Sequence, residues 1–509
     1  MRFERASGVL LHPTCLPGPH GSGDLGPAAY HFVDWLAAAG QRHWQVLPIG
    51  EVGLGNSPYM SPSSFAGNVL LIDPGQLATE GWLHAEPVLP EQGLLERRID
   101  FGAVRRFRME QLHRAHARFR EVALDRDARG QAFVTFCFEE RHWLDDYALF
   151  MALAAQRPGR PWNEWDGPLA TRDPQALHRA QRQLAEQVGF WKFCQWIFRR
   201  QWTELRRYAH SRGVGLIGDL PIFPALNSAE VWARPELFEL DSGGRPTVVA
   251  GVPPDYFSQT GQRWGNPVYR WSEHESCGYN WWIERLKALV GLVDIVRIDH
   301  FRGFAACWEI PAGEPTAIRG RWRAGPGRRL FDALGAALGP LPLIAEDLGV
   351  VTDDVVELRR QFELPGMHVL QFGFTSDADN PHLPHRCARN AVVYTGTHDN
   401  DTAVGWWHSA GVREKGYASL YLGTDGREIH WDLIRAASST VADLVIFPMQ
   451  DVLGLDGAHR LNRPGQESGC WEWRLTWSQV KPAHAERLSA LCAAHGRCEF
   501  SRAPLPSEV

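Results

Sequence analysis

The sequence predicts an α/β fold, specifically a (β/α)8 TIM barrel with inserted, largely helical subdomains and long rim loops. Eight short runs are apolar almost throughout, which is typical of parallel strands covered on both faces. Helix-like spacing separates several runs, as in 30–39, where Phe32, Trp35 and Leu36 are three and four residues apart. Eight strands with intervening helices favour a closed barrel. The predicted strands are 8–11, 43–48, 214–218, 294–298, 341–345, 368–372, 391–394 and 443–447.

The predicted strands are unevenly spaced along the 509 residues. We expect one catalytic barrel over 1–509, with insertions at about 70–210 and 224–290. The first carries extra apolar stripes and predicts a helical subdomain. The second is rich in Gly and Pro and predicts a loop-rich active-site rim.

Composition excludes several classes of protein. Hydrophobic residues make up 44% and charged residues 22%, which argues against bulk disorder. No apolar run approaches the ~20 residues of a membrane span, and the start lacks the long apolar region of a secretory signal. Nine scattered cysteines without a C-x-x-C pair fit a reducing cytosol, so we expect a cytoplasmic protein that binds no membrane.

Two patterns suggest other functions. Residues 21–26 fit G-x-G-x-x-G, the signature of dinucleotide binding, but three prolines separate it from the preceding strand-like run. The second is a group of arginines that could bind nucleic acid, but they flank an apolar helical stripe and favour a solvated face. The net charge of −6 gives no general reason to expect nucleic-acid binding. These arginines are Arg105, Arg106, Arg108, Arg114, Arg118 and Arg120.

Acidic residues follow four of the predicted strands: Asp219, Asp299, Glu346 and Asp399. A single acid after a strand is usually a helix N-cap. In a parallel barrel, however, all strands end on the face that carries the active site. We therefore expect these four side chains to converge.

The neighbours of these acids suggest their chemistry. Arg297 and Asp299 are two apart on a strand and point to the same side, so the guanidinium should lower the pKa of Asp299 and keep it ionised. Like charges and an apolar strand end should raise the pKa of Glu346. One ionised and one protonated carboxyl group flanking a bond is what glycoside chemistry requires. His300 and His398 adjoin these acids and suit neutral hydrogen bonding to hydroxyls.

Three segments carry a family resemblance: Val-Arg-Ile-Asp-His-Phe-Arg-Gly (296–303), Ile-Ala-Glu-Asp-Leu-Gly (344–349) and Thr-Gly-Thr-His-Asp-Asn-Asp-Thr (395–402). They resemble the signature segments of 4-α-glucanotransferases, the amylomaltases of the α-amylase clan. The likeness continues nearly end to end, through 12–14, 56–59, 64–68, 218–223, 251–271, 365–367 and 462–465.

The resemblance implies a role for each matching residue. Asp299 would be the nucleophile, Glu346 the general acid/base, and Asp399 the third carboxylate, which stabilises the transition state. Arg297 and His398 would line the subsite of the cleaved sugar, with Asp219 in support. The remaining expected glucan contacts, including our own aromatic candidate Trp264, are Tyr59, Tyr256, Phe257, Trp264, Asn462 and Pro464. Asn227, His368 and Leu461 depart from the family pattern.

The implied activity is retaining transfer of an α-1,4-glucan segment to the 4-hydroxyl of another glucan or of glucose, with no cofactor and no metal. Retention predicts that the two reacting carboxyl groups lie ~5–5.5 Å apart. Two alternatives remain: an α-glucan hydrolase of the same clan, and a non-catalytic glucan-binding protein on the same barrel.

Overall fold

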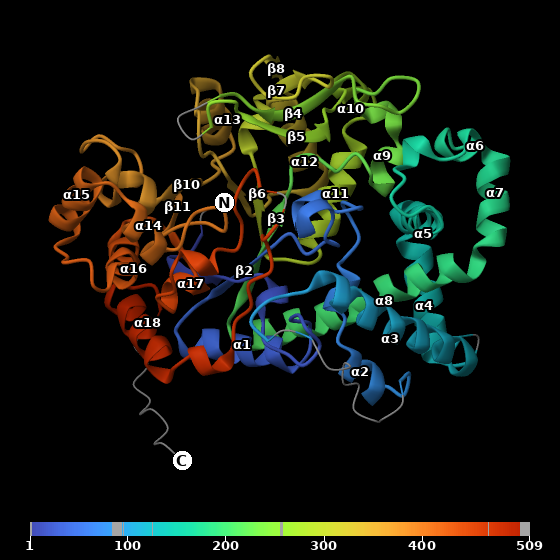
Figure 1. Cartoon of the computed structure of the whole chain (residues 1–509), viewed down its shortest axis with the longest axis horizontal. Helices are drawn as coiled ribbons and strands as arrows, with labels where there is room; N and C mark the ends of the chain where they lie inside the picture. Colours follow the sequence, from blue (N-terminus) through green and yellow to red (C-terminus); the bar gives the residue numbers. More distant parts are fainter. Residues whose placement is uncertain are drawn as a thin grey trace.

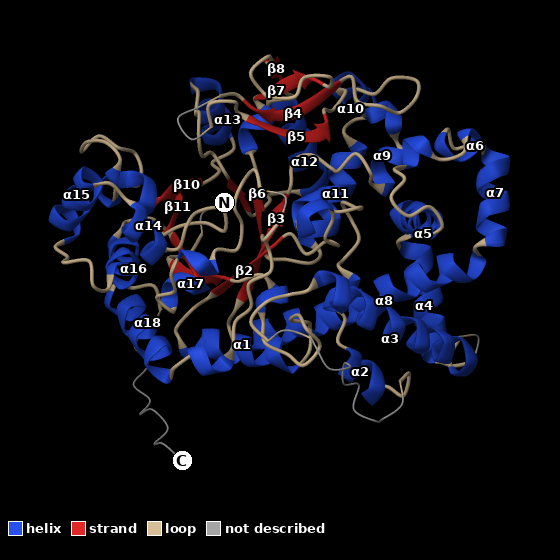
Figure 2. Ribbon diagram, viewed as in Figure 1, coloured by secondary structure: helices blue, strands red, loops and turns tan. Residues whose placement is uncertain are grey.

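The computed structural model describes residues 3–83, 94, 96–124, 126–254, 258–466 and 468–498. Its centre is an eight-stranded sheet, entirely parallel, in the order β10-β11-β12-β1-β2-β3-β6-β9 (Figures 1 and 2). Ala345 N–H donates to Pro365 O at 3.0 Å, beside the start of β10, and so brings the two edges of the sheet together. The strands are β1 (Ala6–Leu10), β2 (His43–Leu47), β3 (Gly215–Leu220), β6 (Ile295–Ile298), β9 (Leu343–Ala345), β10 (Gly366–Val369), β11 (Ala391–Tyr394) and β12 (Leu444–Pro448). The predicted barrel is confirmed, and each of the eight predicted runs overlaps one of these strands.

Helices cover the outside of this sheet (Figure 2). Their apolar faces and the strand residues form one continuous core, in which Val9, Trp44, Ile344 and Val445 have no solvent exposure. Burial of these side chains drives closure of the barrel. The helices that follow or flank the strands are α1 (Pro27–Ala38), α8 (Ala185–Ser211), α11 (Asn280–Val290), α12 (Arg328–Leu338), α13 (Asp353–Gln361), α14 (Ala403–Ser409), α15 (Val412–Leu422), α16 (Ile429–Ser439), α17 (Met449–Val452) and α18 (Pro482–Ala494).

A group of helices lies to one side of the barrel, at the right of Figure 1. It packs through aromatic side chains: Trp82, Phe119 and Trp196 lie 5.3–5.7 Å from one another between ring centroids. The helix α8 runs from this group to the start of β3 and joins it to the barrel. The other helices are α2 (Pro74–Thr79), α3 (Phe101–Val122), α4 (Ala128–Glu139), α5 (Arg141–Ala155), α6 (Gly167–Ala170) and α7 (Pro174–Gln183). In the described part of the chain, no helix has the length and apolar character needed to cross a bilayer.

The arginines of α3 do not all lie on a solvated face. Arg108 is only 1% exposed and donates to Ile72 O and to the Asp24 carboxylate, at 2.6 and 2.8 Å. The expectation of a solvated face is therefore wrong for Arg108. Other arginines of α3 do form surface ion pairs, as Arg114 does with Glu110.

A second, antiparallel sheet sits above the barrel in the order β5-β4-β7-β8 (Figure 2, top). Its strands β4 (Val248–Val252) and β5 (Gln262–Pro267) belong to 224–290, together with α9 (Ala229–Ala233) and α10 (Trp271–Ser276). This segment is thus more regular than expected. Gly and Pro interrupt its strand pattern, and its partners β7 (Ala306–Pro311) and β8 (Arg321–Ala324) come from later in the chain.

Candidate active site

The barrel brings the four predicted acids to one end of the sheet. Asp219 lies in β3 and pairs in register with Arg297 of the neighbouring strand β6. Asp299 follows β6 directly, and Glu346 follows β9, the strand next to β6. Parallel pairing places these positions at the same level, so their side chains share one space.

Arg297 connects three of these acids. Its Nη1 lies 2.6 Å from Asp219 Oδ2 and 3.1 Å from Asp299 Oδ1, and its Nη2 lies 3.9 Å from Glu346 Oε2. The Arg297 side chain is only 4% exposed. One buried guanidinium thus contacts three carboxyl groups. Its single positive charge cannot neutralise three carboxylates, so protonation of at least one of these carboxyl groups is favoured.

Glu346 is held by two backbone donors. His300 N–H donates to Oε2 at 2.6 Å and Leu348 N–H donates to Oε1 at 2.9 Å. Burial nevertheless raises the pKa of Glu346 to about 7, with the Asp299 charge adding to the effect and Arg297 opposing it. The expected upward shift is confirmed. A carboxyl group with this pKa can give and take a proton near neutral pH.

The expected lowering of the Asp299 pKa is wrong in its net direction. Burial raises the pKa of Asp299, Arg297 opposes this, and the nearby Asp399 adds to it. Burial also raises the pKa of Asp219 to about 7. The sequence argument considered only the Arg297–Asp299 pair and left out the burial of Asp299 and the charge of Asp399.

Asp399 belongs to the same group but is held by a different loop. Asn462 Nδ2 donates to its Oδ1 at 2.6 Å, and Arg460 donates to its backbone carbonyl at 2.9 Å. His398 Nε2 lies 3.3 Å from the same carboxylate oxygen. The Asp399 side chain is 44% exposed, so it can meet a ligand. Pro464 is exposed on the loop that carries Asn462.

Aromatic rings cover one side of the acids. The Tyr59 hydroxyl donates to Asp219 Oδ2 at 2.8 Å, and its ring stacks on His398 with centroids 5.3 Å apart. Trp471 lies behind both rings, at 5.8 Å from Tyr59 and 5.6 Å from His398. Burial lowers the pKa of His398, so this imidazole is neutral at pH 7.

A second aromatic contact lies near Glu346. Trp264 meets the His300 ring edge-on, with centroids 4.8 Å apart. Burial lowers the pKa of His300 to about 3, which keeps it neutral. The other two aromatic candidates, Tyr256 and Phe257, lie outside the described residues.

Sequence reasoning missed three contributors to the site. Trp471 stands in no motif and is one of 22 tryptophans, so no local pattern singled it out. The Arg460 side chain donates to the backbone carbonyl of Asp399, and the backbone N–H of Leu348 donates to the Glu346 carboxylate. Only Arg460 could have been suspected, because it stands two residues before Asn462 in the chain.

The structure shows what the three residues that depart from the family pattern contact. Asn227 Oδ1 accepts a hydrogen bond from Trp162 N–H at 3.1 Å, a bond that a carboxylate would also accept. His368 lies beside His382, with ring centroids 6.0 Å apart, and feels the charge of Asp347. Leu461 is 3% exposed and fills core volume as a methionine would.

The glycine-rich segment 21–26 serves packing. A Cβ on Gly23 would lie 2.0 Å from Pro13 O, and one on Gly26 would lie 2.7 Å from the Asp73 carboxyl carbon. Asp24 also accepts from Gly26 N–H at 3.1 Å, just before α1 begins. Two carboxylates at this helix start would repel a pyrophosphate, which contradicts the dinucleotide hypothesis.

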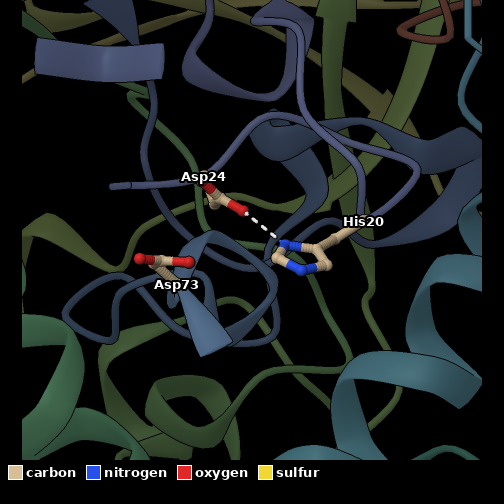
Figure 3. Close-up of side chains that lie close together, drawn as sticks. All are labelled: His20, Asp24 and Asp73. Carbon is tan, nitrogen blue, oxygen red and sulfur yellow. Dashed lines mark hydrogen bonds and ion pairs between the residues drawn. The ribbon is translucent and has the colours of Figure 1, made fainter. Parts of the chain in front are cut away.

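One group of side chains elsewhere has the residue types of a metal site: His20, Asp24 and Asp73 (Figure 3). Asp24 Oδ2 already bonds to His20 Nδ1 and to Arg108, at 3.2 and 2.8 Å. Asp73 accepts from the backbone N–H groups of Gly75 and Gln76 as the N-cap of α2. The Arg108 guanidinium occupies the place of a cation, so this cluster is a structural link.

Known proteins are similar to this chain in sequence and in fold. A family profile described as 4-alpha-glucanotransferase matches residues 11–479. The chain is 49% identical to the 4-alpha-glucanotransferase of Thermus thermophilus (98% of this chain, all of that one) and 47% identical to that of Synechocystis (98% and 99%). Among solved structures, an amylomaltase from Streptococcus agalactiae in complex with acarbose superposes with a TM-score of 0.93 at 36% identity, covering 97% of this chain and 100% of that one. This chain therefore belongs to the 4-alpha-glucanotransferase family and is an enzyme of that type.

Proposed function

We propose that the protein transfers segments of α-1,4-glucans by double displacement with retention. Asp299 attacks the anomeric carbon while Glu346 protonates the departing glycosidic oxygen, which leaves a covalent glycosyl-enzyme. Glu346 then removes the proton from the 4-hydroxyl of an acceptor glucan or glucose, and the α-1,4 bond re-forms. The observation that carries this assignment is the contact of one guanidinium, Arg297, with both Asp299 and Glu346.

The electrostatics support these roles. Glu346 and Asp219, with pKa values raised to about 7, take up protons near neutral pH. The Asp299 carboxylate then has the Arg297 guanidinium at 3.1 Å and stays ionised, as a nucleophile must. The Asp399 carboxylate accepts hydrogen bonds from sugar hydroxyls and favours the distorted sugar ring of the transition state.

We assign the remaining neighbours to glucan binding. Tyr59, His398, His300 and Trp264 surround the acids with neutral rings that can stack on sugars or bond to hydroxyls. Asn462 orients Asp399. We propose that Arg297 and His398 line the subsite of the cleaved sugar and that Asp219 supports it. Pro464, Tyr256 and Phe257 are proposed as further glucan contacts.

We further propose that residues 1–509 form one catalytic unit, that the enzyme works in the cytoplasm, and that it needs no cofactor or metal. All nine cysteines are free, which supports a reducing compartment. Growth of substrate chains, rather than hydrolysis, requires that bound acceptor outcompetes water, and the aromatic surroundings of the acids support this.

Incubation with maltotriose alone tests the proposal. We expect glucose together with chains longer than maltotriose. Glucose and maltose with nothing longer would identify a hydrolase, and unchanged maltotriose would refute the assignment. Asp299→Asn should abolish turnover, whereas Asp425→Asn, at an exposed ion pair with Arg427, is the matched control and should be active.

A further inference from the structure

Five arginines line a cavity of about 320 Å³ outside the glucan site. Its walls come from two distant segments, which are joined by backbone hydrogen bonds. Ile99 N–H donates to Glu472 O at 2.7 Å, and Arg474 N–H donates to Arg97 O at 3.2 Å. The charged side chains of the lining are Arg97, Arg98, Arg460, Arg463, Arg474 and a single acid, Glu472.

The positive charge of this arginine cavity is poorly compensated by its own lining. Glu472 pairs with Arg98, and Asp401, which is not part of the lining, lies 4.0 Å from Arg460. Arg463 donates through Nη2 to Gly457 O at 3.1 Å. Among the described residues, no carboxylate lies within ion-pair distance of Arg97 or Arg463. Most of the N–H donors of these two guanidinium groups are therefore available to a ligand.

The arginine cavity is also partly pre-organised. Arg474 is 2% exposed, and its Nη2 donates to Gly18 O and Leu16 O at 2.9 and 3.3 Å. Arg460 is fixed by its bond to the Asp399 carbonyl. Gathering like charges around a cavity costs free energy unless an anion neutralises them. Guanidinium forks match the paired oxygens of a phosphate group, and the volume admits a phosphoryl group with part of a sugar.

We propose that the arginine cavity binds the phosphate group of a phosphate monoester. That group has two sources: a small free phosphate compound, or a phosphate carried on a glucan chain. In either case the anion would lie beside Arg460, whose guanidinium also bonds to the backbone of Asp399. Occupancy of the cavity is thereby linked to the loop that orients this acid.

Calorimetric titration with inorganic phosphate, at constant ionic strength against chloride, tests the proposal on the full chain. We expect one saturable site, weakened at least about tenfold by Arg97→Ala and by Arg463→Ala, each of which removes charge-assisted hydrogen bonds. Arg114→Ala is the matched control, because Arg114 is 64% exposed on α3 and pairs with Glu110. It should bind phosphate as the wild type does.

A second titration separates the two sources. It uses the Asp299→Asn variant, which should not turn the probes over, and compares a maltooligosaccharide that carries a 6-phosphate with the same chain without phosphate. Equal binding of the two chains, together with binding of inorganic phosphate, identifies the free anion. Much tighter binding of the phosphorylated chain than of the unphosphorylated chain identifies the glucan-borne group. The proposal is overturned if neither probe binds more tightly than its control, or if folded Arg97→Ala and Arg463→Ala variants bind both probes unchanged. Because binding is measured without turnover, this result is independent of the maltotriose assay.

Discussion

The backbone N–H of His300 donates a 2.6 Å hydrogen bond to the Glu346 carboxylate. His300 adopts a left-handed conformation to make this bond, with φ 50° and ψ 50°. An L-residue with a Cβ adopts this conformation at a cost of about 1 kcal/mol. The chain therefore stores strain at the residue that follows the proposed nucleophile, and this conformation aims the backbone N–H at the proposed acid/base.

This relationship predicts how position 300 tolerates substitution. His300→Asn should fold with nearly wild-type stability, because Asn tolerates the left-handed region, while the loss of the imidazole raises KM. His300→Val should lose about 1–3 kcal/mol of unfolding free energy, because a β-branched side chain is strained there. Urea unfolding of both variants checks the difference. Equal stability of the two would contradict the role of the backbone conformation.

The pKa of Glu346 predicts the alkaline limb of the activity profile. Glycosidic cleavage needs the protonated acid, so kcat/KM for maltotriose should fall as pH rises through about 7. A glycosyl fluoride donor needs no protonation of its leaving group. With this donor, the rate of glycosyl-enzyme formation should therefore show no alkaline limb. An alkaline limb of the same pKa with both donors would show that another group controls it.

The raised pKa of Asp299 predicts how the stability of the fold depends on pH. The folded state raises the pKa of Asp299, so folding binds a proton that the unfolded chain has released, and stability falls as pH rises between the unfolded and folded pKa values. Asp299→Asn removes this cost. At pH 8 its unfolding free energy should therefore exceed that of the wild type. The gain should vanish well below pH 4. A less stable variant at pH 8 would contradict the uncompensated charge around Arg297.

Asn462 should matter through the orientation of Asp399. Its amide donates at 2.6 Å, so Asn462→Ala should lower kcat by about 10- to 100-fold. Asn462→Asp places a second carboxylate against the first and should be worse. Steady-state kinetics with maltotriose compare the two, with Asn390→Ala as a control, since Asn390 is only partly buried and its side chain bonds to Glu363 O. A wild-type kcat in both Asn462 variants would contradict the proposal that Asn462 orients Asp399.

The barrel was predictable because each of its strands is a short, almost wholly apolar run, which indicates a buried parallel strand even where the partner lies far away in the chain, as for β1 and β12. The antiparallel sheet was not predictable, because Gly and Pro interrupt the pattern of β4 and β5. Without such a run these strands leave no local signature.

The acids were predictable from their place after strands, but the direction of the Asp299 pKa was not. That direction is set first by the burial of Asp299 and then by the balance between Arg297, which lowers the pKa, and Asp399, which raises it; both depend on tertiary packing. Trp471 likewise reaches Tyr59 through tertiary packing alone.

The most direct test of the proposed chemistry is to trap the glycosyl-enzyme. A Glu346→Gln variant supplied with maltotriosyl fluoride can form the intermediate but lacks the base that activates an acceptor. Intact-protein and peptide mass spectrometry should show one added maltotriosyl group, on the peptide that contains Asp299. Attachment to a peptide that contains Asp219 or Asp399 instead would contradict the assignment of Asp299 as the nucleophile, and so would consumption of the fluoride without any covalent adduct.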